Sequence, residues 1–243
     1  MYRQLNAQKI VDTAATLERR IGERFPESGL SKLAGEVHAV ARETVERLHW
    51  IRRPHLVLRC SIGLLLVALV SVFGVLFVTL RTSDVREVGT FIQVLEAGLS
   101  SLFFIGASVV FLVTWESRIK RNRALRAIHE LRAMAHIVDM HQVTKNPEAV
   151  LTPQSNTASS PVRKLTPFEL GRYLDYCSEL LSLLGKISAL YSQGLDDPVV
   201  LDAVDDVEDL TTELSQKIWQ KITLLETLKE SSATGAGDDR GSA

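Results

Sequence analysis

Two apolar runs dominate the chain: LRCSIGLLLVALVSVFGVLFVTL at residues 58–80 and FIQVLEAGLSSLFFIGASVVFLVTW at residues 91–115. In the first run the only ionisable side chain after Arg59 is the thiol of Cys60. At about 1.5 Å per residue such a run forms a helix roughly 30 Å long, the thickness of a bilayer's hydrocarbon core. A buried core helix of a soluble domain rarely needs more than about 14 such residues. The two runs therefore predict two transmembrane helices, joined into a hairpin by a short polar turn.

Basic residues flank only one end of this predicted hairpin. Two precede the first run, one lies at its start and four follow the second: Arg52, Arg53, Arg59, Arg118, Lys120, Arg121 and Arg123. The turn RTSDVREVGT balances its two arginines with Asp84 and Glu87. Because Lys and Arg beside a span stay on the cytoplasmic side, both termini are predicted to be cytoplasmic. We call the seven residues the basic collar. It is expected either to hold anionic lipid head groups or only to fix the topology.

Small and polar residues interrupt the apolar runs. The small ones recur at helical spacing: Ala68, Ser71, Gly74, Ala97 and Ser101. In lipid such residues let helices approach closely, and we expect them to pack the hairpin against itself rather than against another subunit. Glu96 is the one carboxylate within either run, which makes it a functional candidate together with Ser101. Its place at the outer edge of the second run favours a solvated, interfacial glutamate.

The segments beside the membrane are predicted to be helical. Residues 1–57 show two apolar stripes at helical spacing, separated by the turn FPESG at 25–29 and ended at Arg53-Pro54. We expect them to form a cytoplasmic helical pair. Residues 116–144 contain neither Gly nor Pro, so the second span is predicted to continue unbroken into the cytoplasm to about His141.

The C-terminal part begins with a linker. Residues 145–164 are rich in Pro, Ser, Thr and Asn, which predicts a flexible segment. Thr166, Pro167 and Glu169 then form a helix start with a capping box. Residues 165–230 carry two heptad-like apolar seams, with Thr211 and Lys221 as polar interruptions, and predict an antiparallel α-hairpin. Its uncovered apolar surface should pack on another subunit, the N-terminal helices or the 116–144 extension. Residues 231–243 read as a disordered tail.

Composition and motifs exclude several kinds of function. The net charge of -1 gives no electrostatic reason for nucleic-acid binding. The two cysteines are expected to be buried thiols in a reducing compartment. In HELRAMAH, Ala133 stands where a zinc-protease helix needs its second histidine, and the pair His136 and Asp139 lacks further ligands. Without a phosphate loop, nucleophile elbow or paired-carboxylate site, we expect no enzyme activity, no cofactor and no metal.

The sequence thus predicts an all-α integral membrane protein with a two-span hairpin and cytoplasmic helices. The favoured function is a membrane-anchored helical scaffold or adaptor that self-associates or binds a cytoplasmic protein. The alternative is an oligomeric two-span channel or membrane-perturbing effector gated by its cytoplasmic helices. The expected partners are the lipid bilayer and a protein, not nucleic acid or a small-molecule substrate. The absence of eukaryotic targeting signals points to a bacterial cytoplasmic membrane.

Overall fold

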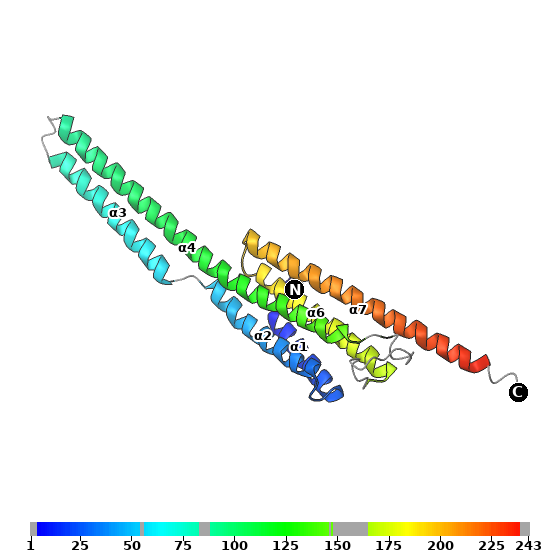
Figure 1. Ribbon diagram of the computed structural model, residues 1–243. Helices are drawn as coiled ribbons and strands as arrows, with labels where there is room; N and C mark the ends of the chain where they lie inside the picture. The colour runs from blue at the N-terminus through cyan, green and yellow to red at the C-terminus, as the bar shows by residue number, and fades with distance from the viewer. Residues whose placement is uncertain (1–3, 54–55, 83–87, 146, 148–164, 239–243) are drawn as a thin grey trace. The chain divides into compact units, whose positions relative to one another are not determined.

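The computed structural model describes residues 4–53, 56–82, 88–145, 147 and 165–238 (Figure 1). Within these ranges the regular structure is helical and no strand occurs, so the all-α prediction is confirmed. The labelled helices are α1 Ala7–Arg24, α2 Gly29–Arg52, α3 Leu56–Thr82, α4 Val88–Val143, α6 Pro167–Ser192 and α7 Pro198–Asp238. Most of the predicted linker and the centre of the turn between the apolar runs lie outside the described residues.

The chain divides into two compact units. One, here called the helical unit, combines Met1–Trp50 with Ala124–Ala243. The other, here called the apolar hairpin, is Ile51–Arg123. Helix α4 contributes residues to both units and is unbroken from Val88 to Val143. The predicted continuation of the second apolar run as a single helix is therefore confirmed, with its end two residues beyond His141.

Helix α6 is the centre of the helical unit. Buried residues occur in every turn of it: Leu170, Tyr173, Leu174, Tyr176, Cys177, Leu180, Leu181, Leu183, Leu184, Gly185, Ile187, Ser188, Leu190 and Tyr191. Such a distribution exceeds the single stripe of a surface helix and needs neighbours on several sides. Helix α7 packs along α6, and α1 packs on it as well. Burying one Leu or Ile side chain contributes about 1.5–3 kcal/mol, so α6 supplies much of this unit's core.

Of the three coverings expected for the C-terminal hairpin, the structure shows packing on the N-terminal helices. The ring of Phe25, just after α1, packs edge-on against Tyr173 and Tyr176 of α6, with centroids 5.4 and 6.2 Å apart. Near the other end of α6, the Tyr191 hydroxyl donates to Thr44 Oγ1 of α2 at 3.3 Å. The C-terminal part of α4 adds a further apolar side, where Leu131, Ala135 and Val138 are fully buried.

Local polar contacts fix the starts of α6 and α7. The Glu169 amide donates to Thr166 Oγ1 at 3.2 Å, and the Thr166 amide donates to Glu169 Oε2 at 2.8 Å, which confirms the predicted capping box. At α7, the Asp197 carboxylate accepts from the Val199 amide at 3.1 Å. In the turn between α1 and α2, Glu27 has a φ of 57°, a conformation that side-chain-bearing residues adopt mainly in tight turns.

The end of α7 differs from the sequence prediction. The helix continues to Asp238, so residues 231–238, expected as disordered tail, are helical, and residues 239–243 lie outside the described part of the chain. Extending an existing helix adds one hydrogen bond for each residue ordered, whereas starting a helix is costly. With no proline between residues 199 and 238, α7 meets no strong stop, although Gly235 and Gly237 are weak helix formers.

Candidate functional site

The most conspicuous surface is the apolar outside of the hairpin. Only 6% of the most apolar stretch of α4 is buried. The exposed large apolar side chains are Leu56, Leu64, Leu66, Val67, Val70, Phe73, Val75, Phe77, Val78, Ile92, Leu95, Leu99, Leu102, Phe103, Phe104, Val110, Phe111, Val113 and Trp115. Leaving them in water would cost on the order of 20 kcal/mol, more than the 5–15 kcal/mol stability of an ordinary domain. Uncovered surface of this extent marks a membrane or protein contact.

Length and composition support one membrane span. Among the described residues, the helix Leu95–Val143 is long and apolar enough to cross a bilayer. The apolar run of described residues in the other helix, Arg59–Val75, is shorter. A single such helix is weak support for a membrane location. The second span therefore stays a prediction.

Hydroxyl groups inside the hairpin are bonded within their own helices. Ser71 Oγ donates to the Val67 carbonyl at 2.9 Å, and Ser101 Oγ donates to the Ala97 carbonyl at 2.8 Å. Ser108 and Thr114 make the same contact with the carbonyl four residues earlier. Such bonds satisfy a hydroxyl without water, as a hydrocarbon surrounding requires.

The less exposed positions of the hairpin lie on one side of each helix. The less exposed positions of α3 follow one face, Ile62, Leu65, Leu69 and Val72, and those of α4 follow Gly98, Ser101, Ile105, Val109 and Leu112. Ala68, Ser71 and Gly74 are exposed, so the expectation that small residues pack the hairpin against itself is wrong for α3. In α4, Ser101 is half-buried but Ala97 is exposed, so of this pair only Ser101 agrees with the expectation. The less exposed positions named in α3 carry branched side chains, whereas in α4 they include the small residues Gly98 and Ser101.

The basic collar is mostly exposed. Arg53, Arg59, Arg118 and Arg123 are exposed, whereas Lys120 and Arg121 are partly covered. Lys120 Nζ lies 2.8 Å from Glu116 Oε1, and the two side chains are only 15% and 17% exposed. The side chain of Arg52 is not among the side chains that the structure describes. Six of the seven predicted collar residues thus belong to the described surface of the hairpin.

Glu96 is the remaining predicted site residue, and it lies in a different unit from His136 and Asp139, for which no metal site was expected. Glu96 is exposed in the hairpin. Cys60 is exposed as well, so the expectation of two buried thiols is wrong for Cys60 and right for Cys177. His136 is also exposed, in the helical unit, and Asp139 Oδ1 accepts a hydrogen bond from Gln142 Nε2 at 2.5 Å. Within the described ranges, no three His, Cys, Asp or Glu side chains gather as metal ligands would.

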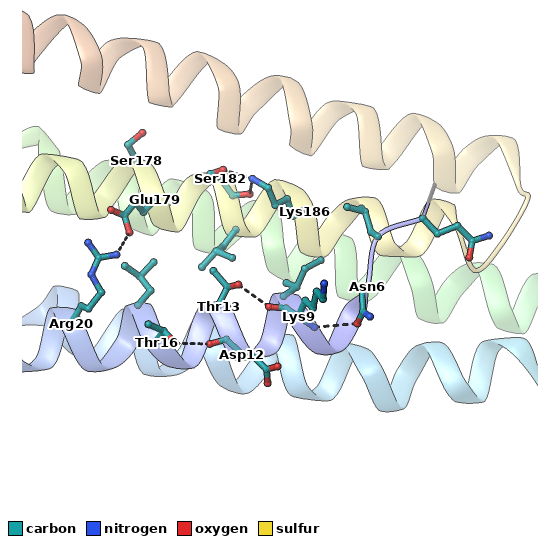
Figure 2. A pocket seen from close by; sticks show the side chains of 15 residues that line it. Asn6, Lys9, Asp12, Thr13, Thr16, Arg20, Ser178, Glu179, Ser182 and Lys186 are labelled. Atoms are coloured by element: carbon teal, nitrogen blue, oxygen red, sulfur yellow. Dashed lines mark hydrogen bonds and ion pairs between the residues drawn. The ribbon is translucent and has the colours of Figure 1, made fainter. Parts of the chain in front are cut away.

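A groove of about 1300 Å³ lies between α1 and α6 (Figure 2). Its lining combines Gln4, Leu5, Asn6, Lys9, Ile10, Asp12, Thr13, Thr16, Leu17 and Arg20 with Ser178, Glu179, Ser182, Leu183 and Lys186. Arg20 Nη1 reaches across to Glu179 Oε2 at 3.0 Å. Buried Ile10, Leu17 and Leu183 give the groove an apolar part beneath these polar groups. This surface offers a polar rim and an apolar floor for contact with another helix or peptide.

The groove does not carry the chemistry of a serine hydrolase. Lys186 Nζ donates to Ser182 Oγ at 2.5 Å, which resembles a serine–lysine pair in its residue types. Both side chains, however, lie on the exposed side of one helix, four residues apart. A lysine acts as a base only when a desolvated setting holds it neutral, and the backbone amides of α6 are used within the helix.

Two polar clusters of the helical unit were not predicted as sites. In the first, the Arg47 guanidinium binds Glu43 Oε2 at 2.6 Å and Glu130 Oε2 at 2.9 Å, which connects α2 to α4. In the second, Lys221 Nζ of α7 donates to the Gln142 carbonyl of α4 at 3.0 Å. Burial lowers the pKa of Lys221, and the negative charge of Asp139 partly opposes this. Both clusters join helices that are distant in sequence, which suits a structural role.

A comparison with protein-family models finds no matching family, and comparisons with curated proteins and with solved structures find no similar protein.

Proposed function

We propose that this protein is a membrane-anchored helical scaffold, with α3 and α4 as a two-span hairpin. The observation that carries the proposal is the uncovered apolar surface of both helices. In α3 the apolar sequence continues beyond Val75 to Leu80, which gives the run the length of a span. In this arrangement the lipid bilayer surrounds the apolar side chains that α3 and α4 leave exposed.

The proposed orientation places both termini in the cytoplasm. Arg53 and Arg59 stand at the start of α3, and Arg118, Lys120 and Arg123 follow the apolar part of α4. An excess of cations at this one end of the hairpin favours its retention on the cytoplasmic side. In that orientation the helical unit is presented to cytoplasmic proteins or to further copies of the chain.

A scaffold is favoured over a channel by the bonding of the span hydroxyls. The hydroxyls of Ser101, Ser108 and Thr114 are bonded to carbonyls of α4, so none needs a water-filled lumen. The helical unit, by contrast, offers the α1–α6 groove and a second, uncharged surface on α7. That surface is formed by Gln216, Trp219, Gln220, Thr223, Leu224 and Thr227, and Trp219 in it is 58% exposed. An exposed tryptophan among uncharged neighbours is typical of binding surfaces.

Membrane extraction and cysteine labelling test the anchor and its topology. The full chain should stay with membranes washed in alkaline carbonate. In a Cys60→Ser background, Asp12→Cys and Thr212→Cys should react with a membrane-impermeant maleimide only after the cytoplasmic side is opened. Ser83→Cys in the turn should react in intact cells. Extraction by carbonate would overturn the anchor, and external labelling of Asp12→Cys would overturn the orientation.

The mass of the protein in mild detergent separates scaffold from channel. Light scattering corrected for bound detergent should give a monomer or dimer, which supplies at most four spanning helices and cannot enclose an aqueous pore of this composition. A discrete larger ring that conducts ions in bilayers would overturn the scaffold. If the α7 surface mediates self-association, Trp219→Glu lowers the dimer fraction, and Met140→Glu on exposed α4 surface serves as the matched control.

A further inference from the structure

One outward face of α4 changes from apolar to cationic within two helical turns. Phe111, Trp115 and Arg118 are spaced by four and three residues, which places them on the same face. All three are exposed, and Phe111 and Trp115 keep 61% and 49% of their surface uncovered. We call these three residues the aromatic–arginine stripe.

The order of side chains along this stripe determines which chemical groups a ligand needs in order to match it. The rings of Phe111 and Trp115 lie against each other, with centroids 5.6 Å apart and planes tilted by 34°. Arg118 follows Trp115 at a rise of roughly 5 Å along the helix axis. A matching molecule therefore has an apolar part, a neutral polar junction for the indole and, just beyond it, an anionic group for the guanidinium.

No carboxylate in the described part of the chain pairs with the guanidinium of Arg118. Among the described residues, Arg118 makes no ion pair. The acid nearest in sequence, Glu116, is two residues away, points to another side of the helix and is bound by Lys120 at 2.8 Å. Arg121 and Arg123 add positive charge to the same end of α4. The described part of the hairpin therefore supplies no anion to Arg118.

From this placement we infer that the aromatic–arginine stripe of α4 binds an anionic phospholipid of the surrounding bilayer. The acyl chains lie along Phe111, the glycerol region meets Trp115, and the phosphate binds Arg118. The inference rests on the proposed membrane anchor and deepens it, since it names a preferred lipid and the residues that select it.

Fluorescence quenching at Trp115 tests this assignment directly. The full chain with Trp50→Phe and Trp219→Phe keeps Trp115 as its only tryptophan, and it is reconstituted in phosphatidylcholine bilayers. Brominated phosphatidylglycerol or brominated phosphatidylcholine is then added at equal mole fraction. We expect phosphatidylglycerol to bind beside Trp115 with about fivefold preference, the effect of one cation near an anionic head group. Arg118→Gln should abolish the preference, and Arg132→Gln, an exposed α4 arginine outside the hairpin, should leave it unchanged.

The outcomes separate this inference from the membrane anchor. Equal quenching by both lipids would overturn the lipid preference and leave the anchor standing, whereas no quenching by either would overturn both. Inorganic phosphate at matched ionic strength should not reduce the preference, and displacement by it would overturn the assignment to lipid. If the double tryptophan variant does not fold, native mass spectrometry of the natural chain gives the same comparison. Retained phosphatidylglycerol adducts that Arg118→Gln loses support the inference, and adducts that it keeps overturn it.

Discussion

Gly185 of α6 offers a quantitative test of the packing between α6 and α7. A Cβ at this position would lie 3.0 Å from Thr211 Oγ1, closer than normal van der Waals contact. Thr211 is 5% exposed, and its hydroxyl is held by the Glu208 carbonyl at 3.0 Å, so it has little room to move. Overpacking of a core costs about 1–3 kcal/mol, whereas Gly→Ala inside a helix gains up to about 1 kcal/mol. Gly185→Ala should therefore lower the free energy of unfolding by about 1 kcal/mol.

Removing Thr211 Oγ1 should reverse the effect of Gly185→Ala on the free energy of unfolding. In a Thr211→Ala background the new methyl group has space, and Gly185→Ala should stabilise by up to about 1 kcal/mol, a coupling of about 2 kcal/mol between the two sites. Gly171→Ala on the same helix is the matched control, because its Cβ would lie 3.7 Å from Leu225 Cδ2, an ordinary contact. It should stabilise in either background.

Urea titration of the full chain in mild detergent, followed by far-UV circular dichroism, measures these effects. The free energy of unfolding must depend on urea concentration with the same slope in every variant, so that a shifted midpoint reports a change in stability alone. The reasoning would be refuted if Gly185→Ala stabilised the natural chain as much as Gly171→Ala does, since α6 and α7 would then not approach as closely as the distance implies.

Three further predictions concern the helical unit. Thr166→Ala should lower the free energy of unfolding by about 1 kcal/mol through loss of the capping box, whereas Thr166→Ser should retain most of it; an unchanged urea midpoint for Thr166→Ala would contradict the capping account. Burial raises the pKa of Cys177 to about 12, so in the Cys60→Ser chain this thiol should resist maleimide at pH 8 until urea is added, and rapid labelling of the folded chain would speak against burial. Burial, with help from the charge of Lys145, lowers the pKa of His141 below 6.5. The unfolded chain therefore binds this proton first, and the associated stability is present above pH 6.5 and lost as the pH falls through the folded pKa. The drop in urea midpoint from pH 7.5 to 5.5 should be smaller in His141→Gln than in the natural chain and unchanged in His136→Gln; equal drops in all three would exclude the effect.

Structural features that depend only on a few neighbouring residues could be predicted from the sequence. Thr166, Pro167 and Glu169 specify a helix start by themselves, because the capping contacts span three residues. The uninterrupted helix beyond Trp115 followed equally from the absence of glycine and proline. In both cases the deciding interactions join residues that are close in sequence, so the sequence alone is enough to predict them.

Features that depend on how helices are rotated were not predictable. In α3 every face is apolar, so hydropathy does not tell which face packs inward, and the smallness of Ala68, Ser71 and Gly74 suggested the wrong one. The α1–α6 groove and the contact of Lys221 with Gln142 join residues that are far apart in sequence. Their position follows from tertiary packing, which no short pattern encodes.

The division of the helical unit between the two ends of the chain affects its synthesis. Trp50 and Pro167 belong to one compact unit, yet 116 residues lie between them. A ribosome needs roughly 6–23 s to add these at about 5–20 residues per second. During that interval α1 and α2 have been made while α6, against which Phe25 and Thr44 pack, does not yet exist. Their apolar stripes therefore lack these α6 partners while residues 51–123 are being synthesised. A nascent chain stalled before Pro167 should therefore bind chaperones through its N-terminus and release them once α6 emerges.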